Sequence, residues 1–392
     1  FALFVKNPPA RISDKGLGWL LIGLVLAGML HVIHVPVWIL GLFLLTVGWR
    51  YRMMKKNKPM PSRPVLFTFA ACTADLPGSI WQNDASDKPD TLTVMTHDSF
   101  AVSAELIEDF ESENNLKINF LKSGDTGTAL NKAILSKGNP IADVFYGVDN
   151  TFLSRALDEG IFEKYISPQL DQIDDEFELD SGHRALPVDY GDVCLNYDKS
   201  YFSSMNLSPP GTLEDLLETD YKGMLVVQNP ATSSPGLAFL FTTIGHFGDE
   251  GYLDYWKSLV DNEMLVVNDW ETAYYSEFSG SSGRGPRPVV VSYNSSPVFE
   301  LIYSETALDE PPTAAVVGHD TCFRQIEFVG ILDGTNNRAA AEKWVDFMLS
   351  TRFQEDLPLQ MFVFPVNSDS ILDETFIEYL EIPQNTSRVS YE

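Results

Sequence analysis

From residue 91 onward, short apolar stretches alternate with segments that carry the apolar stripe of a helix. Strands are expected at 92–96, 116–121 and 142–148, with helices at 103–112 and 128–136 between them. Further strand-like runs are VCLNYD (193–198), MLVVQN (224–229), PVVVSYN (288–294) and IEFVGIL (326–332). Strand–helix alternation of this kind predicts an α/β architecture with mainly parallel sheets.

The first part of the chain predicts a different structure, a membrane hairpin. Residues 16–49 form an uncharged run of 34 positions. As one helix it would span about 51 Å, against roughly 30 Å of hydrocarbon. Pro36 divides the run, so two short membrane helices are expected, Leu17–Val35 and Val37–Trp49. Basic residues at both ends place both ends in the cytoplasm. Residues 1–64 are therefore assigned to an α-helical membrane hairpin, with a buried hairpin of a soluble core as the alternative.

Residues 65–90 are expected to connect the hairpin to the α/β part. The stretch VLFTFAAC resembles a signal peptide that ends in a lipoprotein cleavage box at Cys72; a third membrane pass is the alternative. Residues 73–90 are polar and turn-rich, as expected of a tether. The first 70 residues also resemble the N-terminal membrane hairpins of bacterial transglutaminase-like membrane proteins.

Charge is divided unevenly along the chain, which has 27 Lys/Arg and 55 Asp/Glu. Residues 1–64 hold nine of the basic and one of the acidic residues, which leaves 18 basic and 54 acidic residues, a net charge of −36, for the remainder. A surface this acidic repels nucleic acid, whose binding requires Lys and Arg against phosphates. It tolerates or attracts small cations. Nucleic acid is therefore excluded as a partner.

The three cysteines, Cys72, Cys194 and Cys322, form no CxxC motif and no zinc-ligand spacing with histidine. Cys194 and Cys322 either pair in one disulfide, if this part is exported, or remain buried free thiols. We favour free thiols because Cys194 lies inside an apolar strand pattern.

Catalytic motifs such as GxSxG, HExxH, a Walker loop or GxGxxG do not occur in the sequence. The remaining arrangement is Cys194 with His183 or His319 and one of the many aspartates. It defines one alternative, a membrane-bound cysteine hydrolase or transglutaminase-like protein. We expect no enzyme activity, no metal site and no cofactor.

Two segments share the order strand, polar loop, Ser-Ser-Pro, helix: residues 224–241 and residues 288–303. Ser234 and Ser296 are the expected N-caps, with proline at the first helical position. Each helix start would direct unpaired N–H groups out of a loop at the carboxyl end of a strand, where α/β proteins bind ligands. Such a site suits a phosphate or another anion, and simple capping is the alternative.

Aromatic and acidic residues gather near the same loops. Trp270, Tyr274 and Tyr275 follow one strand, Tyr293 precedes the second Ser-Ser-Pro, and Asp125 precedes another helix. An aromatic face beside a carboxylate can hold an organic cation. For each ring, core packing is the alternative.

Eight sequence blocks, in order, resemble the periplasmic thiamine-binding proteins of thiamine ABC transporters. The resemblance covers about residues 91–370, and it is specific because the blocks occur in the family's order. They are MTHDSF (95–100), GDTGTALNKAI (124–134), ADVFYGVDN (142–150), LPVDYGDVCLNYDK (186–199), QNPATSSPGL (228–237), NDWETAY (268–274), VSYNSSP (291–297) and FVFPVN (362–367).

The resemblance implies a set of ligand-binding residues. These are the pair Asp125 and Thr126, the hydroxyl pair Ser233 and Ser234, the stacking Trp270, and the stretch Tyr293, Asn294, Ser295 and Ser296, with His97 and Tyr274 beside them. His97 stands where the family has a ring tyrosine, Thr126 where it has glycine, and Phe299 where tyrosine is common. These departures bear on the preference among thiamine, its monophosphate and its diphosphate.

The resemblance also implies the fold, a type II periplasmic-binding fold with two α/β lobes and a hinge. Lobe 1 is expected at 91–188 and lobe 2 at 189–322, with 323–392 returning to lobe 1 and forming the C-terminal helices. The chain is expected to cross between lobes near Asp189–Val193 and near Gln325–Val329. The lobes are expected to close on the ligand.

The implied function is that of an extracytoplasmic protein that captures thiamine or its phosphates for an ABC importer. Its partner would be the membrane permease, and it would act on the periplasmic or extracellular face, tethered to the membrane or released. A ferric-ion-binding protein of the same fold is the alternative, with Tyr274 and Tyr275 as adjacent tyrosine ligands and His97 as an added one.

Overall fold

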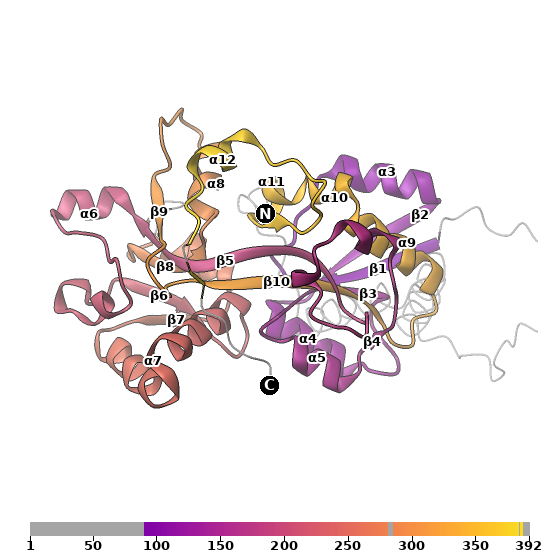
Figure 1. Ribbon diagram of the computed structural model, residues 1–392, viewed down its shortest axis with the longest axis horizontal. Helices are drawn as coiled ribbons and strands as arrows, with labels where there is room; N and C mark the ends of the chain where they lie inside the picture. Colours follow the sequence, from indigo (N-terminus) through magenta and orange to yellow (C-terminus); the bar gives the residue numbers. More distant parts are fainter. Residues whose placement is uncertain (1–89, 281–284, 384, 387–392) are drawn as a thin grey trace, which may run out of the picture. The chain divides into compact units, whose positions relative to one another are not determined.

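One mixed β-sheet organises the residues that the structure describes, which are 90–280, 285–383 and 385–386 (Figure 1). In this computed structural model the sheet has the order β2-β1-β3-β10-β5-β8-β6-β7, with β9 and β11 paired to β5 and β4 paired to β10. The strands are β1 (Asp90–Thr96), β2 (Leu116–Lys122), β3 (Val144–Asp149), β4 (Phe162–Glu163), β5 (Leu186–Asp198), β6 (Leu225–Gln228), β7 (Leu265–Val267), β8 (Val289–Tyr293), β9 (Thr313–Val316), β10 (Phe323–Leu332) and β11 (Phe364–Pro365).

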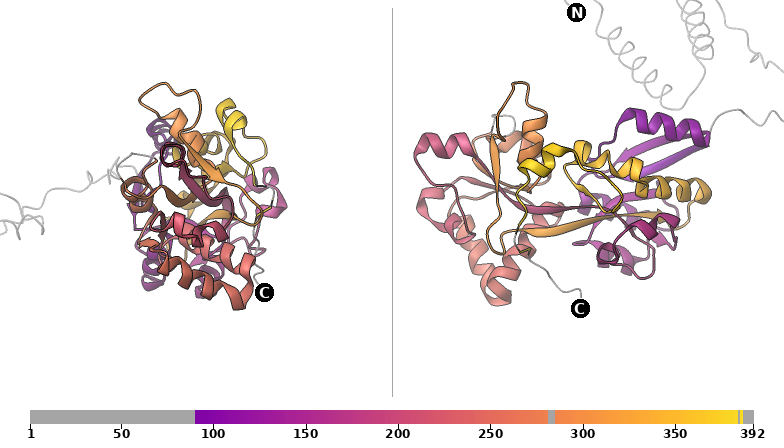
Figure 2. Two further views of the ribbon diagram at one scale, coloured as in Figure 1. Left: turned by 90° about the vertical axis from the view of Figure 1, so that its left-hand side faces the viewer. Right: turned by 45° about the horizontal axis from the view of Figure 1, so that its top comes forward.

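Helices pack around the strands; α3 lies on one side of β1 and β2, and α4 and α5 lie on the other (Figures 1 and 2). The α-helices are α3 (Ala104–Asn114), α4 (Thr126–Leu135), α5 (Leu153–Glu159), α6 (Lys199–Met205), α7 (Ser234–Asp261), α8 (Ser296–Ile302), α9 (Arg338–Leu349), α10 (Thr351–Gln354), α11 (Leu357–Met361) and α12 (Glu374–Tyr379). Shorter turns of helix are η1 (Pro168–Gln172), η2 (Asp175–Phe177), η3 (Glu214–Leu217), η4 (Thr219–Tyr221) and the π-helical η5 (Thr272–Glu277).

The early strands and helices form where the sequence predicts them. Strand β1 pairs in parallel with β2 along its whole length, and the side chains of Leu92 and Val94 are fully buried. Helix α3 ends at Asn115, whose left-handed φ of 51° terminates it. Helix α4 begins two residues before the expected start, because the Asp125 carboxylate accepts a hydrogen bond from Thr126 N (2.9 Å) and caps the helix there.

Two hydrophobic cores divide the described residues into two lobes. The first core contains Leu92, Phe145 and Trp344, so the C-terminal helix α9 packs with the first strands of the chain. The second contains Phe239 and Val291. The chain thus returns to the first lobe after it has formed the second, as the two-lobed fold requires.

Strands β5 and β10 belong to both cores. On β5, Val188 is buried in the first core and Val193 in the second; on β10, Phe323 is buried in the second and Ile326 in the first. The two strands run side by side between the lobes in both views (Figures 1 and 2). The crossings lie on these strands, and the lobe boundaries at 188/189 and 322/323 stay predictions.

The centre of the sheet corrects the expectation of mainly parallel pairing. Parallel pairs join β1 with β2 and β3, and β6 with β7 and β8. Strand β10, however, is antiparallel to both β3 and β5, and β5 is antiparallel to β8. Strand–helix alternation predicts parallel pairs within each lobe; it does not show that two strands return through the sheet to connect the lobes.

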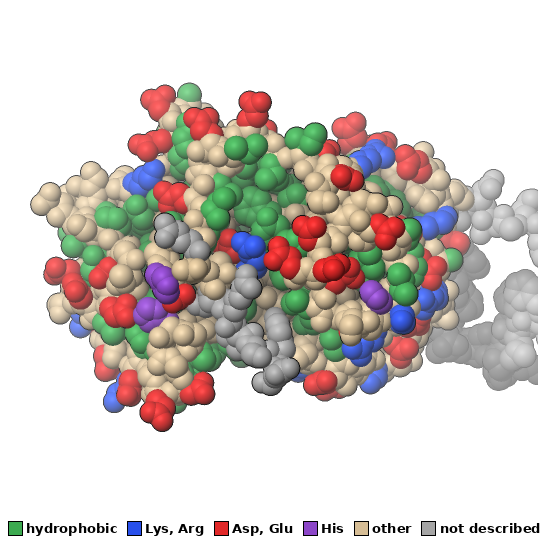
Figure 3. Space-filling model, in the orientation of Figure 1, with side chains coloured by type: hydrophobic (Ala, Val, Ile, Leu, Met, Phe, Trp, Pro, Cys, Tyr) green, Lys and Arg blue, Asp and Glu red, His purple; other side chains and the backbone are tan. Residues whose placement is uncertain are grey.

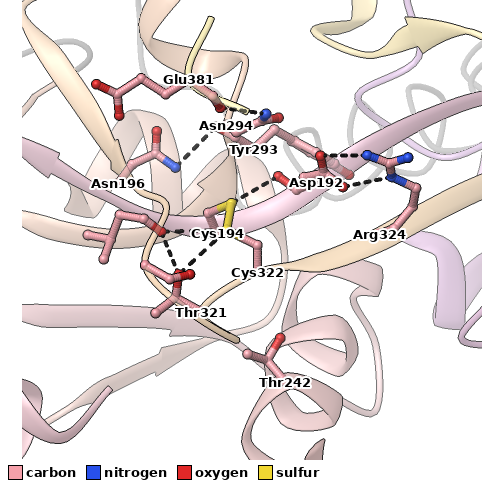
Figure 4. Close-up of a disulfide and its surroundings, with 12 residues drawn as sticks. Asp192, Cys194, Asn196, Thr242, Tyr293, Asn294, Thr321, Cys322, Arg324 and Glu381 are labelled. Atoms are coloured by element: carbon pink, nitrogen blue, oxygen red, sulfur yellow. Dashed lines mark hydrogen bonds and ion pairs between the residues drawn. A yellow bond between two sulfur atoms is a disulfide. The ribbon is translucent and has the colours of Figure 1, made fainter. Parts of the chain in front are cut away.

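The structure also overturns the preference for free thiols at Cys194 and Cys322. The two cysteines form a disulfide between β5 and the start of β10, with their Cα atoms 4.4 Å apart (Figure 4). The antiparallel register pairs Val193 with Phe323, which puts the two cysteines opposite each other. Both are fully buried. The apolar strand pattern around Cys194 therefore predicted its burial correctly. It could not show that Cys322, 128 residues later, lies opposite it.

The predicted membrane hairpin (1–64) and the signal-like segment and linker with Cys72 (65–89) lie outside the described residues. Within the described residues, no helix combines the length and apolar character needed to span a bilayer.

Acidic side chains predominate over basic ones on the face shown in Figure 3, in agreement with the charge of the sequence. Apolar side chains gather near the middle of this face. Arg324 pairs with Asp192 across the strands that connect the lobes (Nε–Oδ1 2.8 Å, Nη2–Oδ2 3.0 Å; Figure 4). This is a bidentate ion pair, which holds β5 and β10 in register beside the disulfide.

Removing the disulfide should destabilise the protein. Cys194 and Cys322 are 128 residues apart in sequence, so their bond closes a long loop in the unfolded chain, and such bonds contribute about 2–4 kcal/mol. The double variant Cys194→Ala with Cys322→Ala should lose free energy of unfolding of this order in urea, whereas Cys72→Ala, the control, should not. Alkylation of both Cys194 and Cys322 in unreduced, denatured protein would contradict the pairing.

Candidate functional site

A cavity of about 340 Å³ lies between the lobes, a size typical of small-molecule sites. The first lobe contributes residues 97–101, 122, 125–126 and 327 to its walls. The second contributes 234–235, 270–271, 275, 293 and 299, and the end of α11 with the residues after it contributes 360–363. The cavity is therefore complete only when both lobes are in contact.

Trp270 is the centre of an aromatic wall. Its indole stacks on Tyr274 (ring centroids 4.9 Å apart, planes at 13°), and its Nε1 donates to Ser292 Oγ at 3.0 Å. Tyr275 and Phe362 meet the indole edge-on, with centroids 5.4 and 5.9 Å away. Since Tyr274 covers one face of the indole and Ser292 fixes its edge, the ring is held rigidly where it lines the cavity.

Two helices begin at the cavity. Helix α4 starts at Thr126 and helix α7 at Ser234, and both residues line the cavity. The N-cap of α7 is Ser233, one residue before the expected Ser234, and the N-cap of α8 is Ser295, one residue before the expected Ser296. The proline at the second helical position allows the helix to begin one residue earlier than we predicted.

The lobes contact each other at these helix starts. Trp270 N of the second lobe donates to Asp125 Oδ2 of the first at 3.3 Å. Gly127 N of the first lobe donates to Thr232 O of the second at 3.0 Å. A Cβ on Gly127 would lie 2.7 Å from Ala231 O, so the backbones approach more closely than any other residue would permit. The structure is therefore a closed form.

His97 and Glu327 face each other at the base of the cavity, with Nε2 and Oε1 3.8 Å apart and both side chains buried. Burial alone lowers the pKa of His97, but Glu327 and Asp125 outweigh it and raise the pKa above its usual value. Burial raises the pKa of Glu327, and His97 outweighs that effect and lowers it. The two groups therefore favour an imidazolium–carboxylate pair.

Further carboxyl groups lie behind this pair. The Tyr146 hydroxyl is within hydrogen-bond distance of Asp189 Oδ2 (2.6 Å) and Glu327 Oε2 (2.9 Å). Burial and the facing Glu327 raise the pKa of Asp189 well above its usual value. Burial raises the pKa of Asp149 to about 7. Burial also raises the pKa of Asp125 above its usual value. Burial thus favours the protonated form of Asp149 and Asp189, which lowers the repulsion among the neighbouring carboxyl groups.

The family is decided by a direct match. Residues 139–379 match the family of bacterial extracellular solute-binding proteins. The chain belongs to this family. The sequence-based resemblance is thereby confirmed, as is the extracytoplasmic location. A protein of this family takes a small-molecule ligand and works with a membrane permease.

Similarity to known proteins extends over most of the length of this solute-binding protein. It is 28% identical to the thiamine-binding periplasmic protein of Brucella suis, over 77% of this chain and 87% of that protein. It is 29% identical to the thiamine-binding periplasmic protein of Salmonella typhimurium, over 70% and 80% respectively. A solved structure of a periplasmic thiamin binding protein superimposes with a TM-score of 0.67 at 27% identity, over 76% of this chain and 90% of that one. The predicted two-lobed periplasmic-binding fold is confirmed.

Of the site residues predicted for this solute-binding protein, six line the cavity: His97, Asp125, Thr126, Ser234, Trp270 and Tyr293. Ser233 is buried behind them, next to Asp125. The other four are turned to internal contacts. Ser295 donates to Phe362 O, Ser296 Oγ lies 2.9 Å from Ser292 Oγ, Asn294 Nδ2 donates to Glu381 O at 3.1 Å, and Tyr274 lies under Trp270. The second Ser-Ser-Pro thus braces the cavity wall.

Both alternatives from the sequence meet obstacles in the structure. Cys194 is bonded to Cys322, and nucleophilic catalysis requires a free thiolate, so Cys194 is not available as the nucleophile that the cysteine hydrolase requires. For the ferric site, only Tyr275 of the adjacent tyrosines lines the cavity. Tyr274 is 1% exposed, and burial with the nearby Glu300 raises its pKa well above the usual value. Tyr274 therefore lies outside the lining of the cavity that the ferric alternative would use.

Several cavity residues escaped the sequence analysis. The cavity is also lined by two residues from the C-terminal part of the chain, Phe362 and Glu327. The other lining residues that the sequence analysis missed include Lys122, Glu271 and Phe100. Phe362 lies inside a block used for the resemblance, and its left-handed φ of 64° turns the chain at the cavity. Its position next to Trp270 depends on the return of the chain between the lobes, which no local pattern shows.

Proposed function

We propose that this protein captures thiamine or its phosphates outside the cytoplasm and delivers them to the permease of an ABC importer. No reaction is catalysed, and no cofactor or resident metal takes part. The observation that carries the proposal is one cavity that combines the fixed indole of Trp270 with the carboxylate of Asp125. The thiamine-binding periplasmic proteins to which the chain is similar add support.

The aromatic wall suits a flat, positively charged heterocycle. Trp270, Tyr275, Tyr293 and Phe299 present rings to the cavity, and the face of an aromatic ring attracts a cation. Asp125, Glu271 and Glu327 add carboxylates. In the proposal the thiazolium lies against the rings, and the Asp125 carboxylate interacts with the positive charge or with the aminopyrimidine. Closure excludes water and strengthens each of these contacts.

The start of α7 suits the oxygen-bearing arm of the ligand. Ser234 and Pro235 line the cavity, and the first N–H groups of a helix have no partners within the helix. A hydroxyl or a phosphate placed there accepts hydrogen bonds from N–H groups and from serine hydroxyls, and it meets the positive end of the helix dipole. In the proposal Ser233 and Ser234 therefore matter more for thiamine diphosphate than for free thiamine.

In the proposal, closure of the lobes encloses the bound ligand. Asp125 serves two purposes in this proposal, because its carboxylate both caps α4 and accepts from Trp270 N of the other lobe. The shared strands β5 and β10 would act as the hinge. The proposal includes membrane attachment through the segment before residue 90, so that the closed protein stays near its permease.

Trp270 gives the first test. Trp270→Ala should weaken thiamine binding by at least about 1–2 kcal/mol, the order expected for a desolvated stacking contact, as measured by calorimetry. Thiamine should also quench the tryptophan fluorescence of the wild type. The same quenching is expected in the control variant Trp256→Phe, because Trp256 lies within α7 and its Nε1 donates to Thr243. Unchanged affinity in Trp270→Ala would rule out this site. Binding of Fe³⁺ in place of thiamine would favour the ferric alternative.

Gly127 tests closure. In Gly127→Ala the new Cβ would meet Ala231 O and Thr232 Cα of the second lobe at 2.7 and 3.1 Å, and Phe152 Cζ of its own lobe at 3.0 Å. The contacts with the second lobe would disfavour the closed form. If the closed population falls tenfold, the apparent affinity for thiamine falls about tenfold. The melting temperature without ligand is measured beside it, because the contact with Phe152 Cζ acts within the first lobe and opposes the roughly 1 kcal/mol by which alanine favours a helix over glycine. Thiamine affinity equal to that of the wild type would show that the lobes do not close through this contact.

A further inference from the structure

The charges around the cavity are not evenly placed. The second lobe contributes rings and Glu271, whereas the first contributes Lys122 and His97 beside its carboxylates. Among the described residues that line the cavity, Lys122 is the only lysine or arginine. The cavity therefore has an aromatic side and a side with a permanent cation at its edge.

Lys122 is the last residue of β2, next to the loop that leads into α4. Its Nζ donates to the carbonyl oxygen of Asp98 at 2.8 Å. The Asp98 carboxylate itself accepts from Gly124 N at 2.8 Å. An ammonium group has three donors, and the Asp98 carbonyl uses one of them.

The ion pairs found in the part of the chain that the structure describes do not include Lys122. The contrast with Lys117 on the same strand is direct, because Lys117 pairs with Glu111. Lys122 also lies close enough to His97 to lower its pKa, against the stronger effect of Glu327. Lys122 is therefore the group at the edge of this cavity whose permanent positive charge can attract an anionic part of a ligand.

We infer that Lys122 binds the terminal phosphate of a phosphorylated ligand and sets the preference for thiamine phosphates over thiamine. The inference rests on the proposed function, whose ligand supplies a cationic ring for the aromatic side and an anionic arm for the side of Lys122. The arm would pass the starts of α7 and α4, at Ser234 and Thr126, and end at the ammonium group. Without this cation the carboxylates of the cavity would repel a phosphate.

The expected contribution of Lys122 to phosphate binding depends on how exposed its ammonium group is. Lys122 is exposed, so solvent and salt screen its charge. We therefore expect a moderate contribution to the binding of phosphates, about three- to tenfold in affinity, that falls as the salt concentration rises. Free thiamine has no phosphate to reach the edge and should be nearly indifferent to the substitution.

The test compares ligands as well as variants. Dissociation constants for thiamine, thiamine monophosphate and thiamine diphosphate are measured by calorimetry on the full chain, at low and at physiological salt. In Lys122→Gln both phosphates should bind about three- to tenfold more weakly, and the loss should shrink with salt. Lys122→Arg should retain the preference of the wild type, and Lys117→Gln, the control from the same strand, should change none of the three constants.

Each outcome has a defined meaning. Equal losses for all three ligands in Lys122→Gln would mean that the residue only positions the Asp98 loop, and would overturn the inference. Unchanged phosphate affinity would overturn it as well, as would a wild type that binds thiamine and neither phosphate. A wild type that binds no thiamine compound at all would instead defeat the proposed function, so the two failures are distinguishable.

Discussion

The antiparallel pairing of β5 with β10 is the constraint on which the rest of this solute-binding protein depends. Both strands run through both hydrophobic cores, so they connect the lobes and align them. The disulfide and the Asp192–Arg324 ion pair hold the two strands in register at the second lobe. Glu327, which lines the base of the cavity, and Asp189, which lies behind it and meets it through the Tyr146 hydroxyl, project from the same pair of strands. The hinge and the floor of the cavity are therefore one structure.

The cavity follows from what this pair brings together. The first lobe presents Asp125 at the start of α4, and the second presents Trp270 and the start of α7. These groups meet only in the closed form, where Asp125 accepts a hydrogen bond from Trp270 N and Gly127 N donates to Thr232 O. Each lobe alone would leave a half-site exposed to water, and polar contacts are weak there. Closure is what makes a carboxylate and an indole into a site for a cation.

Local chemistry predicted much of this fold. The apolar pattern of β1, the cap at Asp125 and the Ser-Ser-Pro start of α7 are each encoded within a few residues, and each forms close to where it was expected. Long-range features escaped it. The Cys194–Cys322 bond, the antiparallel centre of the sheet and the placement of Phe362 against Trp270 all depend on segments that meet only after both lobes are built. For the same reason, Tyr274 and Ser296 looked like ligand contacts, although they support the residues that line the cavity.

The central claim is that an indole and a carboxylate from opposite lobes enclose a flat organic cation. A crystal structure of the protein grown with thiamine tests this most directly. We expect one thiamine in the cavity between the lobes, with a heterocycle parallel to the Trp270 ring, and with Asp125 within hydrogen-bond or ion-pair distance. Thiamine absent from the cavity at saturating concentration, or bound away from the indole, would contradict the account.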